Sequence, residues 1–328
     1  MFETVRLVKK WWKKWHTLPV MPWLKAALLY KAGRFAEAIP LYQQGLARHP
    51  EHPAKLCARL DLAYCLFRTG KLAEAEQELK NAANLAPQAR EAQLRLAHFQ
   101  MYKGRALEAA WTMRRLLRRV EPDAELVATF LLAVVENGGP NYLLKEASAM
   151  VERLKLDQRV DARHLHKLKV ARAREKMLNG QFDKGKEELA KLACQNPTSL
   201  EAVMAFAELL LKEGKVAFAR QYLRRGLVMA PNHPRLLSLF AESYLLGGPF
   251  YSPEYAIQLA TSACQLSGWS SPRELHVLAE SYFHNGDKMS ALLMASKAKE
   301  EGSRLLGSYR DTKSLEQLIQ ALSSDTLS

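Results

Sequence analysis

The chain has 328 residues and a formal net charge of +14, and 48% of its residues are hydrophobic. Because a single hydrophobic core rarely grows beyond about 250–300 residues, this length predicts either two domains or a stacked array of repeats. The low counts of glycine and proline, 16 and 14, favour helices. The longest apolar run, residues 126–135, is half of the roughly 20 residues that a membrane-spanning helix needs, so we expect no integral membrane protein.

The first predicted element is a basic amphipathic helix over residues 1–18. On a helical wheel its apolar residues gather on one arc and its basic residues fill the opposite arc. This combination suits the boundary of a lipid headgroup layer, because an indole buries its ring while lysine reaches toward anionic headgroups. The pattern predicts an interfacial anchor on an anionic membrane surface. The contact residues that we expect are Lys9, Lys10, Trp11, Trp12, Lys13, Lys14 and Trp15.

Two other interpretations of residues 1–18 stay open. The ends of a helical array need an amphipathic cap, so the segment can cap the array or dock on a partner. Its basic face, together with the net charge of +14, also allows contact with nucleic acid, which is the least favoured of the three. Three tryptophans within five residues are more than a simple cap needs, and this favours the membrane surface.

Residues 19–305 carry an internal repeat that glycine marks. The successive intervals between the marking glycines are 37, 34, 34, 42, 34, 34 and 38 residues. These glycines are Gly33, Gly70, Gly104, Gly138, Gly180, Gly214, Gly248 and Gly286. Seven positions before them stand Ala26, Ala63, Ala97, Leu131, Ala173, Ala207, Ala241 and Ala279. Small residues at a fixed phase predict that two helices approach each other closely at these positions.

Two further positions keep the same phase. Five residues after the glycine stand Ala38, Ala75, Ala109, Ala219 and Ala291. Seventeen residues after it stand Pro50, Pro87, Pro197 and Pro231. Since proline cannot continue a helix, it predicts the end of the second helix of each repeat.

This pattern resembles the tetratricopeptide repeat family. The clearest copies are AALLYKAGRFAEAIPLYQQGLARHP, LAYCLFRTGKLAEAEQELKNAANLAP and FAELLLKEGKVAFARQYLRRGLVMAP. The resemblance implies an all-α fold, a right-handed superhelical solenoid of about eight helix pairs over residues 19–305. Two irregular repeats, residues 124–165 and 234–271, carry Gly-Gly-Pro and an aromatic residue between their helices, which predicts long loops. Residues 306–328 predict a C-terminal capping helix and a tail.

The resemblance also implies a binding surface. In this family the first helices of the repeats line a concave groove that holds a peptide or helix of a protein partner. The glycine phase carries the groove over to Tyr64, Arg68, Arg95, His98, Tyr102, Lys167, Arg174, Glu208, Glu242 and Glu280. The three glutamates occupy one position of successive repeats and predict an acidic ladder that favours a basic partner. The alternative is a solvated face on which Lys212 pairs with Glu208.

The sequence contains no phosphate-binding loop, dinucleotide fingerprint, zinc-protease motif or nucleophile elbow. We therefore expect no catalytic residue, cofactor, metal or small-molecule substrate. The expected function is a non-enzymatic scaffold or adaptor of bacterial type, cytoplasmic and held peripherally on the inner face of a membrane, which serves a biogenesis, export or assembly complex. The alternatives are a soluble assembly factor or complex subunit whose N-terminal helix docks on a partner and, less favoured, a nucleic-acid binder.

Overall fold

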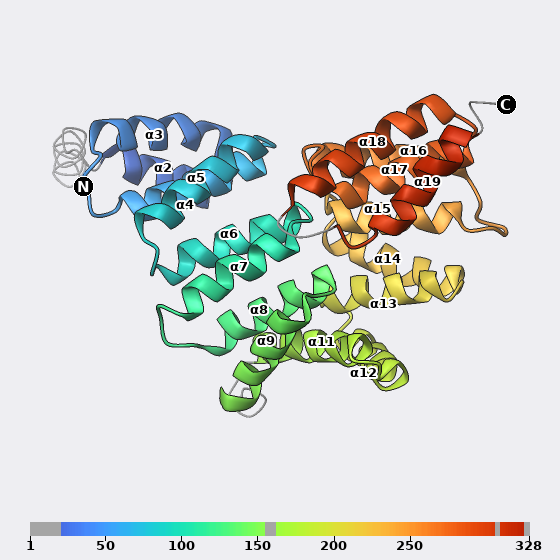
Figure 1. Ribbon diagram of the computed structural model, residues 1–328. Coiled ribbons are helices and arrows are strands. Elements are labelled where there is room, and N and C mark those ends of the chain that lie inside the picture. Colours follow the sequence, from blue (N-terminus) through green and yellow to red (C-terminus); the bar gives the residue numbers. More distant parts are fainter. Residues whose placement is uncertain (1–20, 155–161, 306–308, 325–328) are drawn as a thin grey trace, which may run out of the picture. The chain divides into compact units, whose positions relative to one another are not determined.

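The computed structural model describes residues 21–154, 162–305 and 309–324, and in these residues the protein is all-α (Figure 1). The helices form eight consecutive pairs, followed by a single helix, α19 (Thr312–Ser324). The first helices are α2 (Met21–Lys31), α4 (Lys55–Arg68), α6 (Arg90–Tyr102), α8 (Ala124–Asn137), α11 (Ala162–Leu178), α13 (Leu200–Lys212), α15 (Pro234–Leu245) and α17 (Pro272–His284). The second helices are α3 (Phe35–Arg48), α5 (Leu72–Leu85), α7 (Ala106–Leu117), α9 (Asn141–Leu154), α12 (Phe182–Gln195), α14 (Val216–Met229), α16 (Pro253–Leu266) and α18 (Lys288–Arg304). The predicted fold class and the number of pairs are confirmed.

The chain divides into two compact units. Unit 1 comprises residues 1–96 and unit 2 comprises residues 97–328. Among the described residues, unit 1 holds the first two helix pairs and the start of α6. Unit 2 holds the end of α6 and all later helices.

A glycine with a positive φ angle stands in the turn after the first helix of every described pair. All eight phased glycines have positive φ angles, from 70° at Gly214 to 109° at Gly248. At Gly70, its own N–H donates to the Phe67 carbonyl at 3.1 Å and the next N–H, of Lys71, donates to the Leu66 carbonyl at 2.9 Å. This left-handed turn satisfies the last carbonyls of α4, and an L-residue would be strained there.

The phased alanines lie where helices touch. Each alanine seven positions before a glycine, and Leu131 in the fourth repeat, is at most 1% exposed. The alanines five positions after a glycine are fully buried. The four phased prolines each stand two residues beyond the last residue of a second helix, namely α3, α5, α12 and α14. The small residues therefore mark helix contacts, and the prolines mark the ends of second helices, as the sequence predicts.

The two irregular repeats differ from each other. In the fourth repeat only residues 138–140 separate α8 from α9, so the expectation of a long loop was wrong there. Both Gly138 and Gly139 take positive φ angles, and the chain can reverse within this short span. In the seventh repeat residues 246–252 separate α15 from α16, which is the long turn that the sequence predicts.

A buried cation holds the long turn of the seventh repeat. The Arg220 side chain, on α14, lies over the rings of Phe240, Tyr244 and Phe250, with its guanidinium carbon 4.9, 3.9 and 4.6 Å from their centroids. Arg220 is 5% exposed and also donates to the Tyr244 hydroxyl at 2.7 Å. Cation–π contacts of this kind are strongest where water is excluded, so Arg220 fixes the turn to the neighbouring repeat.

The last helix covers the end of the array. Leu315, Leu318 and Leu322 of α19 are 1%, 8% and 1% exposed. They belong to one apolar cluster with Ala291 and Ala295 of α18. The capping helix predicted for the C-terminal region is therefore present and buries the open face of the eighth pair.

Candidate functional site: the inner face of unit 2

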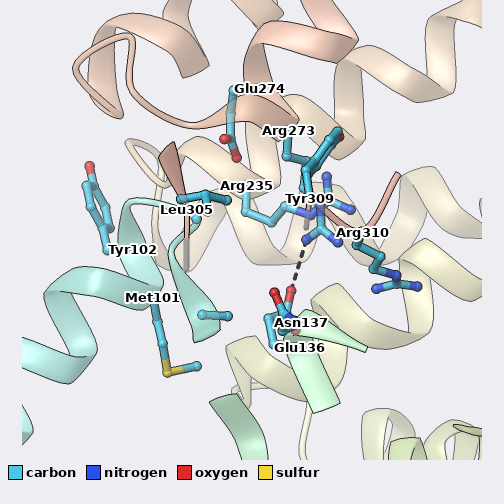
Figure 2. A pocket seen from close by; sticks show the side chains of 12 residues that line it. Met101, Tyr102, Glu136, Asn137, Arg235, Arg273, Glu274, Leu305, Tyr309 and Arg310 are labelled. Carbon is cyan, nitrogen blue, oxygen red and sulfur yellow. Dashed lines mark hydrogen bonds and ion pairs between the residues drawn. The ribbon is translucent and has the colours of Figure 1, made fainter. Parts of the chain in front are cut away.

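The first helices of unit 2 bring charged side chains together. We name as the inner cluster six residues that meet there: Glu136, Arg174, Glu208, Arg235, Arg273 and Arg310. Five of them come from α8, α11, α13, α15 and α17, one from each helix, and Arg310 comes from the segment before α19. Figure 2 shows four of them converging around a narrow pocket of about 50 Å³, together with Tyr309.

Glu136 ties α8 to two other helices. Its carboxylate pairs with Arg174 of α11. It also pairs, at 3.0 Å, with the guanidinium of Arg273 on α17 (Figure 2). Burial acts to raise the pKa of Glu136, but the two guanidinium groups outweigh it and lower this pKa to about 2. The Glu136 carboxylate is therefore ionised at any physiological pH, and its charge is matched by the arginines.

Glu208 is the centre of the cluster. Its carboxylate lies 3.5 Å from Arg235, 3.9 Å from Arg273, 4.0 Å from Arg174 and 3.5 Å from Arg310. Only 12% of the side chain is exposed. Burial opposes ionisation of Glu208, yet the arginines hold its pKa well below the usual range. Removal of an arginine here would leave a buried carboxylate short of a partner.

The acidic ladder expected from the sequence is largely neutralised. Glu208 forms ion pairs with the four arginines, and Glu242 pairs with Arg235 at 3.0 Å. The physical reason lies in the repeat itself, because Arg235 and Arg273 stand at the second position of the seventh and eighth repeats, on the same inner face. Lys212 also lies 3.4 Å from Glu208, which is the pairing named as the alternative.

Glu280, the third glutamate of the ladder, is different. Its described ion-pair contact is His276, whose Nε2 lies 3.5 Å from the carboxylate. Burial, followed by the charges of Glu242 and Asp311, raises the pKa of Glu280 to about 8. Burial also lowers the pKa of His276 to about 4, so this imidazole carries no charge at neutral pH. At neutral pH the Glu280 carboxyl group is therefore mostly protonated, and among the described residues it has no charged cationic partner.

Replacement of Glu280 by glutamine should stabilise the protein in alkaline buffer only. Because the pKa of Glu280 is about 8 in the folded chain and about 4.5 in the unfolded chain, the folded state holds the proton more tightly. Wild-type stability therefore falls as the pH rises from about 4.5 to about 8. With 35% of the side chain exposed, water screens the penalty, and we expect a gain of about 1–2 kcal/mol at pH 9 and none at pH 4.

Urea unfolding followed by circular dichroism at the two pH values measures this gain. Glu254→Gln is the matched control, because Glu254 is exposed on α16 and should show no gain at either pH. A stabilisation by Glu280→Gln that is equal at pH 4 and pH 9 would contradict the assigned burial of its charge.

Two larger cavities open beside the inner cluster. The central cavity, of about 250 Å³, is lined by the apolar residues Met101, Leu132, Leu200 and Met204, and its remaining lining includes His98, Tyr102, Lys167, Arg174, Glu201, Glu208 and His233. The acidic cavity, also of about 250 Å³, is lined by residues that include Glu208, Glu242, Glu280, Asp311, Arg235 and Arg273. The first offers apolar contact beside charged groups, and the second offers four carboxyl groups together with Lys212, Arg235 and Arg273.

The predicted groove residues of unit 2 lie at these two cavities. His98, Tyr102, Lys167, Arg174 and Glu208 line the central cavity, and Glu208, Glu242 and Glu280 line the acidic cavity. The Tyr102 hydroxyl donates to the Leu266 carbonyl at 3.3 Å, and burial and Glu274 raise its pKa to about 12. Lys167 pairs with Glu201 at 3.3 Å.

The other three predicted groove residues belong to unit 1. Arg68 donates to the Tyr64 hydroxyl at 2.9 Å, and its guanidinium carbon lies 4.9 Å from the centroid of the Phe35 ring. Arg95 pairs with Glu91 at 2.6 Å. These contacts are internal to unit 1. The expected contact residues of the N-terminal helix, Lys9 to Trp15, lie outside the described residues.

The sequence argument missed Glu136, Arg235, Arg273 and Arg310. Arg235 and Arg273 occupy the second position of their repeats and Glu136 the thirteenth, and both positions face inward in the family pattern. The glycine phase could therefore have identified these three. Arg310 lies beyond the last repeat, where no phase applies.

The family model described as tetratricopeptide repeat matches residues 29–95 and 176–242. The chain therefore contains tetratricopeptide repeats in these two regions. Its fold is similar to that of a tetratricopeptide repeat protein from Parabacteroides merdae ATCC 43184, at 13% identity and a TM-score of 0.50, with 93% of this chain and 98% of that chain covered. A search of the curated proteins found no significant match to the sequence.

Two further structures have a similar fold. A chain of the APC/C hetero-tetramer Cut9–Hcn1 matches with a TM-score of 0.64 at 13% identity, covering 94% of this chain and 64% of that chain. The human IFIT1 dimer with m7Gppp-AAAA matches with a TM-score of 0.53 at 15% identity, covering 90% of this chain and 70% of that chain. At these identities the likeness shows a shared fold alone.

The match to the tetratricopeptide repeat family supports a role as a protein-interaction scaffold. Proteins of this family are typically non-enzymatic and bind protein partners. None of the helices in residues 21–154, 162–305 and 309–324 combines the length and apolar character that crossing a bilayer requires.

Proposed function

We propose that this tetratricopeptide repeat protein is a non-enzymatic scaffold that holds a segment of a partner protein on the inner face of unit 2. The central cavity is the observation that carries the proposal. Its lining contains two leucines and two methionines, of which the methionines adapt to an inserted apolar side chain, and it also contains charged residues. A volume of about 250 Å³ suits one large side chain of a partner, with the charged residues fixing the orientation of the segment.

We further propose that residues 1–18 attach the scaffold peripherally to the inner, anionic face of a membrane. The support is the sequence, in which Trp11, Trp12 and Trp15 share one arc and lysines fill the other. Each basic residue near an anionic surface contributes about 1 kcal/mol, and the indoles add apolar burial. A scaffold held in this way suits a cytoplasmic biogenesis, export or assembly complex.

Crosslinking of the tagged protein in cells, followed by mass spectrometry, tests the scaffold role. The informative variant is Met204→Trp, which fills the central cavity. The matched control is Phe218→Ser on α14, where the side chain is 60% exposed. We expect partner crosslinks at inner-face residues of unit 2 that Met204→Trp removes and Phe218→Ser retains. Crosslinks that survive Met204→Trp unchanged would reject the cavity as the binding site.

Flotation with anionic vesicles tests the membrane attachment. We expect the full chain to float, and a chain that lacks residues 1–18 to stay in the dense fraction. Replacement of Trp11, Trp12 and Trp15 by alanine should weaken flotation while leaving the basic charge intact. Equal flotation of the full and shortened chains would reject the anchor. Self-association of the full chain without lipid binding would instead favour docking of this helix on a protein.

A further inference from the structure

Arg310 enters the inner cluster from outside the helix pairs. It lies between α18 and α19 and reaches Glu208 of α13, with its terminal nitrogen 3.5 Å from the carboxylate oxygen. Its stem passes over the turn at Gly138, where a Cβ atom would stand 3.6 Å from the Arg310 Cδ. Arg310 therefore reaches the inner face from a segment that lies outside the helix pairs.

Arg310 is also the most loosely held arginine of the cluster. Its side chain is 27% exposed, whereas the exposed fractions of Arg174, Arg235 and Arg273 are 13%, 13% and 15%. Each of the other three pairs with two glutamates, and Arg310 pairs with Glu208 alone among the described residues. Burial and the like charges of Arg273 and Arg174 lower the pKa of Arg310. Loss of this one contact would leave Glu208 with three arginines.

The acidic cavity lies next to this contact, and Glu208 is part of its lining. Glu280 in the same cavity faces His276, which is neutral at neutral pH, and the carboxylates of Glu242 and Asp311. About a third of the Glu280 side chain is exposed, 35%, so a ligand can reach it. The cavity thus combines an arginine that can leave with Glu280, a carboxyl group that is mostly protonated at neutral pH and that a bound cation would help to ionise.

We propose that the partner segment is basic and that it displaces Arg310 from Glu208. One arginine or lysine of the segment takes the place of Arg310 at Glu208, and another contacts Glu280. This proposal rests on the scaffold function proposed above. Exchange of one cation for another at Glu208 leaves no buried carboxylate unpaired, so displacement avoids the main cost of opening a buried ion pair. The second cation adds attraction at Glu280 in a partly buried site, where charges interact more strongly than in water.

Fluorescence anisotropy with fluorescein-labelled hexa-arginine tests this proposal on the full chain. The net charge of +14 repels this probe in general, so binding reports a local acidic site. We expect Arg310→Ala to bind the probe about tenfold more tightly than the wild type, because the resident competitor is gone. Addition of Glu280→Gln should return the affinity to the wild-type level. Arg304→Ala is the matched control, since Arg304 is 62% exposed and pairs with Glu300 and Glu301.

Circular dichroism establishes that each variant is folded. If Arg310→Ala does not fold, Arg310→Met retains the apolar stem and should give the same gain. The proposal would be overturned if a folded Arg310 variant bound the probe with unchanged affinity, or if Arg304→Ala gave an equal gain. Arg310 would then serve only to stabilise the structure. The scaffold function is judged separately by the crosslinks: partner crosslinks on the inner face together with an unchanged probe affinity would reject the displacement alone.

Discussion

Replacement of Arg273 by alanine should lower the free energy of unfolding by about 3 kcal/mol, at the lower end of the range for breaking a buried ion pair. Arg273 is 15% exposed and contacts Glu136 at 3.0 Å and Glu208 at 3.9 Å. Its loss removes one cation from two buried carboxylates at once. Glu136 keeps Arg174 and Glu208 keeps Arg235, which limits the loss.

Urea unfolding followed by circular dichroism measures this effect without the ionic screening that guanidinium would add. Arg304→Ala is again the control, because an exposed pair on one helix contributes less than about 1 kcal/mol. The pKa of Glu136 should also rise above about 2 in Arg273→Ala, as its second guanidinium is gone. Equal destabilisation by the two variants would show that the Arg273 contacts add nothing beyond a surface pair.

Replacement of Gly185 by valine should also destabilise the protein by about 3 kcal/mol. Gly185 lies on α12, five residues after Gly180, at the position where other repeats carry a buried alanine. A Cβ atom here would stand 2.4 Å from the Ala173 carbonyl oxygen of α11 and 2.5 Å from the Met177 Cγ. The first of these contacts is with backbone, so helices α11 and α12 would have to move apart.

Gly247→Ala is the matched control for this prediction. A Cβ atom at Gly247 meets nothing within 4 Å, and its φ angle is not positive. We expect this variant to change the urea midpoint little, whereas Gly185→Val should lower it clearly. If Gly185→Val unfolds at the wild-type midpoint, helices α11 and α12 do not approach as closely as the structure shows.

The fold could be predicted because each repeat restates the same local signals. Gly70 and Gly214 mark turns that need a residue in the left-handed conformation, and Ala63 and Ala207 mark buried helix contacts. The length of the fourth turn could not be predicted in this way. Gly-Gly-Pro is compatible with both a long loop and the tight reversal that residues 138–140 make.

The inner cluster could be predicted only in part. The phase of the repeat predicts that Glu136, Arg235 and Arg273 face inward, since the direction of a side chain depends on its position in its own helix. It does not predict that Glu136 pairs with Arg273, which is 137 residues away, because that depends on how five first helices stack. Arg310 follows no repeat, so only the three-dimensional structure brings it to Glu208.

The capping helix α19 has a consequence for assembly between molecules. Each helix pair presents a face on which a further pair would stack, and α19 covers that face of the eighth pair with Leu315, Leu318 and Leu322. A second copy of the chain therefore meets polar helix surface at this end instead of an open apolar layer. Stacking of a second copy on this face, as head-to-tail growth into a filament would require, is therefore disfavoured.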